Sequence, residues 1–261
     1  MGHIIVKAVL GISLVMQALT PAFAQQPTIR VATEASFPPF SQTEPDGRYT
    51  GFEIDLGNDV CRRIQVTCEW VKQDFDGMIP ALQARKFDMI FSSMSIKPER
   101  QRVADFSIPY YAPTYRFYAR KGAVTSVPDG LKGKKVGVYA GATQEQYLNA
   151  KLKGVVEPRG YKNIDQIHAD LVAGRIDAAF NEAVPAAEFL RSEQGKEFEF
   201  VGPEFNDPEI FGPGAGAMFR KGDPLREKVN AAIRAAYADG TFDRLAARYF
   251  PGVNMRADKT W

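Results

Sequence analysis

Several residue types are scarce in this 261-residue chain, and each scarcity excludes a class of protein. Two Cys and two His are too few for a disulfide scaffold or for a Cys/His metal cluster. Lys and Arg number 33 against 31 Asp and Glu, so the formal net charge is only +2. A general nucleic-acid binder needs a basic face, which this balance does not supply. We therefore expect no metal, no cofactor and no nucleic-acid partner.

Long apolar runs are also missing from the body of the chain. No stretch of about 18 apolar residues follows the first 24 residues, which argues against a membrane transporter. The hydrophobic fraction of 45% and the charged fraction of 25% are those of a folded domain, not of a disordered chain. The length suits one large domain or two medium ones.

The first 24 residues have the pattern of a processing segment. Lys7 is followed by an apolar stretch over residues 8–18, and Ala22 and Ala24 place small residues at positions −3 and −1 of a signal peptidase site. This pattern predicts a secretory signal peptide over residues 1–24, cleaved before Gln25. The alternative interpretation is a buried N-terminal helix.

Export changes what the two cysteines are expected to do. Cys61 and Cys68 are seven positions apart, at the end of one predicted helix and the start of a predicted strand. In an oxidising compartment the two thiols are expected to form a local disulfide. A metal pair or a redox couple is the alternative, although the spacing is not Cys-x-x-Cys and no His lies nearby.

Strand and helix patterns alternate after residue 27, which indicates an α/β fold with largely parallel sheets. The predicted strands cover residues 28–33, 68–71, 87–92, 134–139 and 176–181, and the predicted helices cover residues 51–64, 77–85, 164–174 and 224–250.

Residues 82–93 and 171–182 resemble each other, with Leu, Ala, a basic residue, Asp and Phe in register. Each segment reads as a helix end, a tight turn and a buried strand. A strand pattern opens each half of the chain, so we expect two similar lobes. The ends of the repeated strands, at Ser92-Ser93 and Asn181-Glu182, would then lie at the carboxyl edges of two sheets, where open α/β sheets bind ligands.

Five ordered motifs carry a resemblance to a known family. They are residues 33–40 (TEASFPPF), 51–56 (GFEIDL), 92–100 (SSMSIKPER), 136–144 (VGVYAGATQ) and 238–242 (ADGTF). Together they resemble the periplasmic amino-acid-binding proteins of bacterial ABC importers, of the lysine/arginine/ornithine- and histidine-binding type (solute-binding protein family 3). The resemblance implies a type II periplasmic-binding-protein fold, in which two open, mostly parallel sheets are joined by a two-segment hinge. It implies lobe 1 over residues 27–112 and 214–255, and lobe 2 over residues 113–213.

The resemblance also implies residues for the carboxylate of an amino acid. Arg100 would bind it, because a guanidinium donates two parallel hydrogen bonds. Thr143 would reach the same carboxylate from lobe 2. The sequence after it fits a helix N-cap with Gln146 at position N3, and a helix start attracts anions.

The ammonium of the ligand is assigned by resemblance to Glu182, together with the Ser93 carbonyl and the Ser95 hydroxyl. Ser92 belongs to the same motif. The family usually has Asp at the position of Glu182, so this chain carries one additional methylene there.

The ligand side chain would lie between Phe37 and Phe75, since aromatic faces attract cations and pack against aliphatic stems. Glu34 and Glu53 match family positions that bear acids near its distal end, which favours a cationic ligand. The family often has Tyr at position 37, and its lysine-type members have an aliphatic residue at position 139. Tyr139 would therefore narrow the pocket or add a third aromatic wall.

The resulting expectation is a monomeric periplasmic protein that captures arginine, lysine, ornithine or histidine and delivers it to a membrane ABC permease, without catalysing a reaction. Three alternatives stay open. They are an enzyme resembling the cyclohexadienyl or arogenate dehydratases, a binder of opine-like conjugates, and the sensor domain of a receptor. We expect His168, on a polar helix face, to be a surface residue and not part of a catalytic set.

Overall fold

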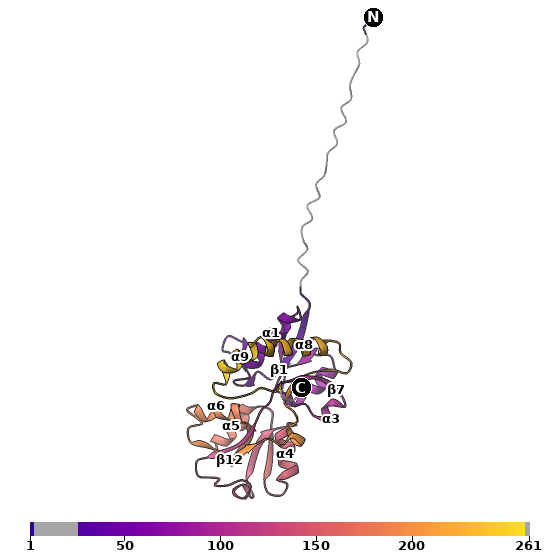
Figure 1. The fold of residues 1–261 in the computed structure, drawn as a ribbon. Helices are drawn as coiled ribbons and strands as arrows, with labels where there is room; N and C mark the ends of the chain where they lie inside the picture. The colour runs from indigo at the N-terminus through magenta and orange to yellow at the C-terminus, as the bar shows by residue number, and fades with distance from the viewer. Residues whose placement is uncertain (3–25, 259–261) are drawn as a thin grey trace.

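The computed structural model describes residues 1, 2 and 26–258, so the predicted signal peptide falls almost wholly outside the described residues. Two bodies lie one above the other in Figure 1, each built on a five-stranded sheet with helices packed against it. The upper body contains both the purple and the yellow parts of the chain, and the lower body contains the pink and orange middle part. The α/β, two-lobed prediction is confirmed.

The first sheet has the strand order β5-β1-β6-β13-β7. Its strands are β1 (Thr28–Thr33), β5 (Thr67–Lys72), β6 (Met89–Ile90), β7 (Ala104–Tyr111) and β13 (Ala215–Arg220). The helices of this body are α1 (Phe52–Arg63), the 3₁₀ helix η1 (Phe75–Gly77), α2 (Met78–Gln83), α3 (Pro98–Gln101), α8 (Leu225–Ala238) and α9 (Thr241–Tyr249). A small antiparallel sheet is formed by β2 (Ser36–Phe37), β3 (Ser41–Thr43) and β4 (Tyr49–Thr50).

The second sheet has the order β10-β9-β11-β8-β12. Its strands are β8 (Tyr115–Arg120), β9 (Lys135–Tyr139), β10 (Glu157–Tyr161), β11 (Ala178–Glu182) and β12 (Phe198–Phe205). Its helices are the 3₁₀ helix η2 (Asp129–Leu131), α4 (Thr143–Lys151), α5 (Ile164–Val172), α6 (Ala183–Arg191) and α7 (Pro208–Phe211). None of the helices in residues 1, 2 and 26–258 has the length and apolarity that a membrane span needs.

Both sheets are mixed but mostly parallel, as predicted, because only one of the five strands in each runs opposite to the others. In the first sheet β13 runs antiparallel to its neighbours β6 and β7, and in the second β8 runs antiparallel to β11 and β12. Each of these is the first strand that the chain forms after crossing from the other body. The chain enters at the junction and must run away from it, whereas the remaining strands run toward it. The junction therefore collects the carboxyl ends of most strands.

Most predicted elements are present with boundaries shifted by one or two residues, and two differ more. The strand predicted over residues 87–92 pairs only at Met89 and Ile90. The helix predicted over residues 224–250 is two helices, α8 and α9. It breaks at Gly240, whose φ of 75° lies in the left-handed region that glycine adopts without strain.

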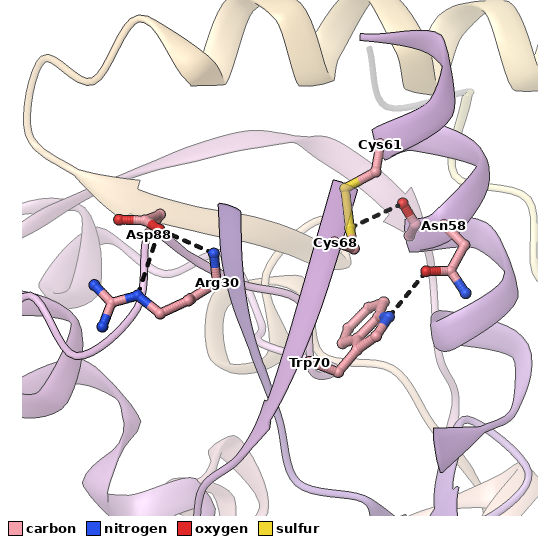
Figure 2. The surroundings of a disulfide bond; sticks show 7 residues. Arg30, Asn58, Cys61, Cys68, Trp70 and Asp88 are labelled. Atoms are coloured by element: carbon pink, nitrogen blue, oxygen red, sulfur yellow. Dashed lines mark hydrogen bonds and ion pairs between the residues drawn. A yellow bond between two sulfur atoms is a disulfide. The ribbon is translucent and has the colours of Figure 1, made fainter. Parts of the chain in front are cut away.

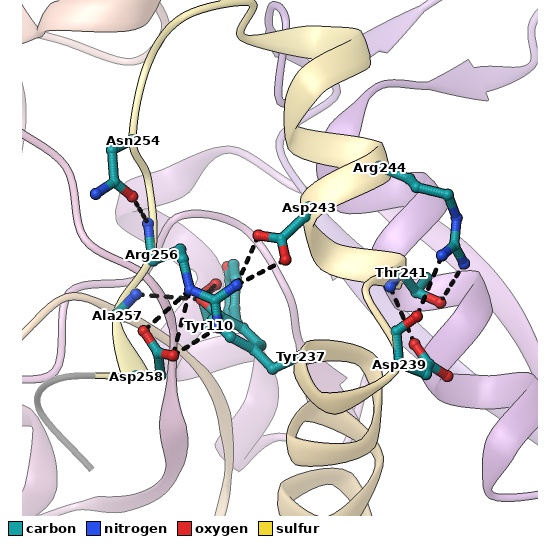
Figure 3. Close-up of polar contacts among 10 residues, drawn as sticks. All are labelled: Tyr110, Tyr237, Asp239, Thr241, Asp243, Arg244, Asn254, Arg256, Ala257 and Asp258. Atoms are coloured by element: carbon teal, nitrogen blue, oxygen red, sulfur yellow. Dashed lines mark hydrogen bonds and ion pairs between the residues drawn. The ribbon is translucent and has the colours of Figure 1, made fainter.

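The C-terminal segment 254–258 packs beside the end of β7. Arg256 pairs with Asp243 of α9 and with Asp258, and its guanidinium lies 4.8 Å from the centre of the Tyr237 ring (Figure 3). The Tyr237 hydroxyl donates to the Tyr110 carbonyl at 2.9 Å and accepts from the Ala257 N–H at 3.2 Å. The end of the described chain is thereby joined to the strand that leads into the second body.

The predicted disulfide between Cys61 and Cys68 is present and joins the end of α1 to β5 (Figure 2). Beside it the Trp70 Nε1–H donates to the Asn58 Oδ1 at 2.9 Å. The indole ring lies so close to α1 that a Cβ on Gly57 would be 2.6 Å from it. The disulfide and this contact hold the edge strand of the sheet against α1.

We predict that a Cys61→Ser/Cys68→Ser variant unfolds with a free energy lower by about 2.5 kcal/mol, because a disulfide that closes a short loop restricts the unfolded chain by about that amount. Urea unfolding of the oxidised protein and of the double variant measures the difference. The variant should be insensitive to a reductant that lowers the stability of the parent. Equal stability of the two proteins would contradict this role of the disulfide.

Candidate functional site

A cavity of about 340 Å³, including its opening to solvent, lies at the junction of the two sheets. The first body contributes Glu34, Phe37, Phe75, Ser92, Ser93 and Ser95, and the second contributes Tyr139, Ala142, Thr143, Gln144 and Glu182. The predicted site residues are thus brought together, with Glu53 and Arg100 lying just behind this lining. Sequence reasoning missed Ala142 and Gln144, which flank the predicted Thr143.

Arg100 is a buried cation that contacts both bodies. It lies on α3 and is only 6% exposed. Its Nη1 donates to the Ser95 carbonyl at 2.9 Å and its Nη2 to the Gly141 carbonyl at 3.0 Å. Its guanidinium carbon is 5.7 Å from the centre of the Phe75 ring. Burial lowers the pKa of Arg100 to about 10, so the side chain stays charged at neutral pH and suits an anionic group in the cavity.

Thr143 does not have the predicted capping role. It is the first residue of α4, and the N-cap position is taken by Ala142 without a side-chain hydrogen bond. The acid that reaches back is Glu145, whose Oε2 accepts from the Gly141 N–H at 2.8 Å. The helix begins one residue earlier than predicted, because Ala142 already has the extended backbone of an N-cap (φ −88°, ψ 169°). Thr143 still lines the cavity at a helix start, where backbone N–H groups lack intrahelical acceptors.

Glu34 is a buried carboxylate, 4% exposed, that receives two hydroxyl groups on one oxygen. The hydroxyls of Ser36 and Tyr139 each lie 3.0 Å from Oε1. The Glu34 N–H donates to the Ser92 Oγ at 3.0 Å, which gives Ser92 a positioning role. Burial raises the pKa of Glu34 to about 8, against these hydrogen bonds, which lower it. A cation entering the cavity would restore the charged form.

Three aromatic rings surround the same part of the cavity. The Tyr139 ring lies edge-on to Phe37, with centroids 5.6 Å apart, and at 62° to Phe75, with centroids 6.0 Å apart. Phe37 is supported from behind by the stacked ring of Phe40 at 5.5 Å. Tyr139 is therefore the third aromatic wall that the sequence suggested. A wall of aromatic faces attracts a cationic side chain.

Glu53 lies behind the cavity wall. It is on α1, fully buried, and its Oε1 accepts from the Ser93 N–H at 2.6 Å, from the Ser93 hydroxyl at 3.2 Å and from the Tyr110 hydroxyl. Ser93 has a φ of 48°, a conformation that costs a non-glycine residue energy and that these bonds hold in place. Burial raises the pKa of Glu53 to about 7.

Glu182 lines the cavity at the end of β11 and is 4% exposed. The Tyr111 hydroxyl donates to its carboxylate at 3.0 and 3.2 Å. Burial holds the pKa of Glu182 well above its usual range, with the charges of Glu53 and Glu34 adding to the effect. Tyr110 and Tyr111 were both missed from the sequence. Two adjacent tyrosines at the carboxyl end of a strand were the available signal.

His168 is not the surface residue that was predicted. It is half-buried, its ring is stacked on Phe189 at 3.9 Å, and its Nε2 is 3.0 Å from the Tyr118 hydroxyl. Burial lowers its pKa to about 4. The face of α5 that carries it packs against α6, a contact that helix periodicity alone does not indicate. Elsewhere in the described residues, no group of three His, Cys, Asp or Glu is placed to hold a metal ion.

Two lobes with buried carboxylates lining one cavity, and a buried guanidinium behind its wall, define a two-lobed ligand-binding protein. Comparison with known families gives the particular one. The sequence profile of the bacterial extracellular solute-binding proteins, family 3, matches residues 29–252. The chain belongs to this family, and its location is accordingly extracytoplasmic.

Individual relatives agree with this assignment. The chain is 43% identical to the L-arginine-binding protein of Pseudomonas aeruginosa, over 93% of this chain and 95% of that one. It is also 43% identical to the lysine/arginine/ornithine-binding periplasmic protein of Escherichia coli, over 94% and 96%. A solved arginine-specific periplasmic binding protein of Salmonella typhimurium superposes with a TM-score of 0.81 at 30% identity, over 86% and 99%. These relatives are binding proteins, so the prediction of a non-enzyme is confirmed against the dehydratase alternative.

The raised pKa of Glu34 predicts how stability varies with pH. Folding favours the neutral carboxyl, so its contribution is complete below about pH 4.5 and is lost as the pH rises toward 8. Relative to Glu34→Gln, the ligand-free parent should lose roughly 1 kcal/mol of unfolding free energy per pH unit between pH 5 and 8. Denaturant unfolding at several pH values measures this, and Glu197→Gln, at an exposed glutamate, controls for the lost charge. A constant difference between parent and Glu34→Gln would show that Glu34 ionises freely.

Proposed function

We propose that this protein captures a basic L-amino acid, namely arginine, lysine, ornithine or histidine, between its two lobes and delivers it to an ABC permease of the inner membrane. The observation that carries the proposal is a cavity lined by two buried carboxylates, Glu34 and Glu182, with the buried guanidinium of Arg100 directly behind its wall. Arginine, lysine and ornithine have one carboxylate and two cationic groups in the same molecule, and histidine has the second cation when its imidazole is protonated. Such a ligand therefore complements the cavity charge for charge.

The α-carboxylate is assigned to Arg100 and to the start of α4 at Thr143. The guanidinium has five N–H donors, and its contacts with the Ser95 and Gly141 carbonyls leave donors for a ligand. Charge-assisted bonds of this kind contribute about 1.5 to 3 kcal/mol each.

The α-ammonium is assigned to Glu182, with the Ser93 carbonyl and the Ser95 hydroxyl on the opposite lobe. Glu182 keeps the Tyr111 hydroxyl as a fixed donor, which sets the direction of its longer side chain. The ligand side chain then extends between Phe37 and Phe75 toward Glu34. Glu53 supports this arrangement through Ser93.

The closing motion is a movement of two lobes toward each other. Lobe 1 consists of residues 27–112 and 214–255, and lobe 2 consists of residues 113–213. Three contacts support closure over the ligand, because each joins the lobes at the cavity: Arg100 with Gly141, Tyr139 with Glu34, and Tyr111 with Glu182. Ligand contacts made from both lobes favour the closed state over the open one. We propose that the protein works as a monomer in the periplasm, exported by the signal peptide at residues 1–24.

The ligand class can be tested with a panel of amino acids in a thermal-shift assay, followed by calorimetry. We expect one or more of arginine, lysine, ornithine and histidine to raise the unfolding temperature by several degrees, since a bound ligand stabilises the folded state. A dissociation constant in the micromolar range corresponds to a binding free energy of about −8 kcal/mol. A panel in which only acidic or aliphatic amino acids act would exclude the assigned role of Glu34. An opine conjugate of arginine belongs in the panel because it tests the opine-binding alternative.

The carboxylate assignment predicts that Arg100→Ala lowers the affinity for every α-amino acid that binds by at least about 100-fold, since the lost bonds are charge-assisted. Arg100→Lys should bind more weakly than the parent, because an ammonium cannot donate two parallel bonds. Calorimetry measures both variants, and the exposed neighbour Arg102→Ala is the matched control. Unchanged affinity in Arg100→Ala would exclude the assignment.

A further inference from the structure

Glu34 is the carboxylate assigned to the distal end of the ligand side chain. Its two oxygens are not equally available to a ligand. Both hydroxyls that reach Glu34, from Ser36 and from Tyr139, donate to Oε1. Within the described residues no hydrogen bond reaches Oε2. A carboxylate oxygen has two lone pairs, so Oε1 is fully used and Oε2 is the oxygen left for a ligand.

The two donors differ in origin. Ser36 follows Ala35, whose φ of 52° turns the chain back, and the Thr43 hydroxyl fixes that turn by donating to the Ala35 carbonyl at 2.9 Å. The serine bond to Glu34 is thus local to one lobe. Tyr139 comes from β9 of the other lobe, so its bond exists only when the lobes are together.

The position of Tyr139 is fixed by packing as well as by its hydroxyl. The side chain is 4% exposed and its ring contacts both Phe37 and Phe75. Moving the hydroxyl away from Glu34 would disturb both aromatic contacts. A ligand cation must therefore bind the Glu34 carboxylate while Oε1 is already occupied.

This restriction affects the two kinds of basic side chain differently. A guanidinium binds a carboxylate best as a fork, with two parallel N–H groups on two oxygens. An ammonium is a compact charge that binds well to one oxygen. On the basis of the proposed function, we propose that Tyr139 is a specificity-determining residue, which makes the cavity prefer a side-chain ammonium over a side-chain guanidinium by holding Oε1 of Glu34.

The test compares dissociation constants for lysine, ornithine and arginine by calorimetry. The parent should bind lysine or ornithine at least tenfold more tightly than arginine. Tyr139→Phe keeps the ring and frees one of the two lone pairs of Oε1, so the preference should fall by about tenfold or more, mainly through tighter arginine binding. Ser36→Ala, which frees the other lone pair of Oε1 without altering the aromatic wall, should shift the preference in the same direction. It also tests the proposal if Tyr139→Phe fails to fold.

The matched control is Tyr147→Phe, since Tyr147 is in the same lobe but packs against Phe180, Phe205 and Phe211 away from the cavity lining. Its ligand preference should equal that of the parent. A parent that binds arginine as tightly as lysine and ornithine, or an unchanged ratio in both Tyr139→Phe and Ser36→Ala, would overturn this proposal and leave the proposed function standing. A parent that binds none of the three, and no other basic amino acid, would overturn the proposed function itself.

Discussion

Buried ionisable groups that no opposite charge among the described residues neutralises are the constraint on which the rest of this structure depends. Glu34, Glu53 and Glu182 are each 4% exposed or less, and the one buried guanidinium at the junction, Arg100, donates to backbone carbonyls. Ionised groups in such places are costly unless an opposite charge compensates them. Hydrogen bonds within the chain stabilise these carboxylates in part. Each accepts one tyrosine hydroxyl: Glu34 from Tyr139, Glu53 from Tyr110 and Glu182 from Tyr111. Of these groups Glu34 and Glu182 line the cavity, and together with Arg100 they complement a doubly cationic, singly anionic ligand.

The topology explains why these groups meet at one place. Most strands of both sheets end at the junction of the two bodies, and the cavity is lined mainly by residues at or soon after those ends. Glu34 follows β1, Glu182 ends β11, and Tyr139 ends β9. The two reversed strands, β8 and β13, mark where the chain crosses between bodies. Because the chain crosses twice, its middle third forms the second body, and the segments before and after that third form the first.

The sequence was sufficient for the fold and for most of the cavity lining, because strand ends, helix periodicity and ordered motifs are local signals. It was insufficient where the outcome depends on contacts between distant segments. The tyrosine partners of Glu53, Glu182 and Glu34 lie 57, 71 and 105 positions away along the chain. The stacking of His168 on Phe189 depends likewise on how α5 and α6 pack. Two errors were local. The N-cap of α4 is Ala142, one residue from the predicted position, and the helix predicted over residues 224–250 is interrupted at the left-handed Gly240.

The C-terminal segment shown in Figure 3 gives the cavity a dependence on residues far from it. The Met255 carbonyl accepts the N–H of Ala112, the residue that follows β7, and Tyr237 joins Ala257 to the Tyr110 carbonyl. The Tyr110 side chain in turn reaches Glu53 and, through it, Ser93. The tail is therefore a brace on the strand that crosses between the bodies, and under the closing motion proposed above it would add mechanical resistance at that crossing.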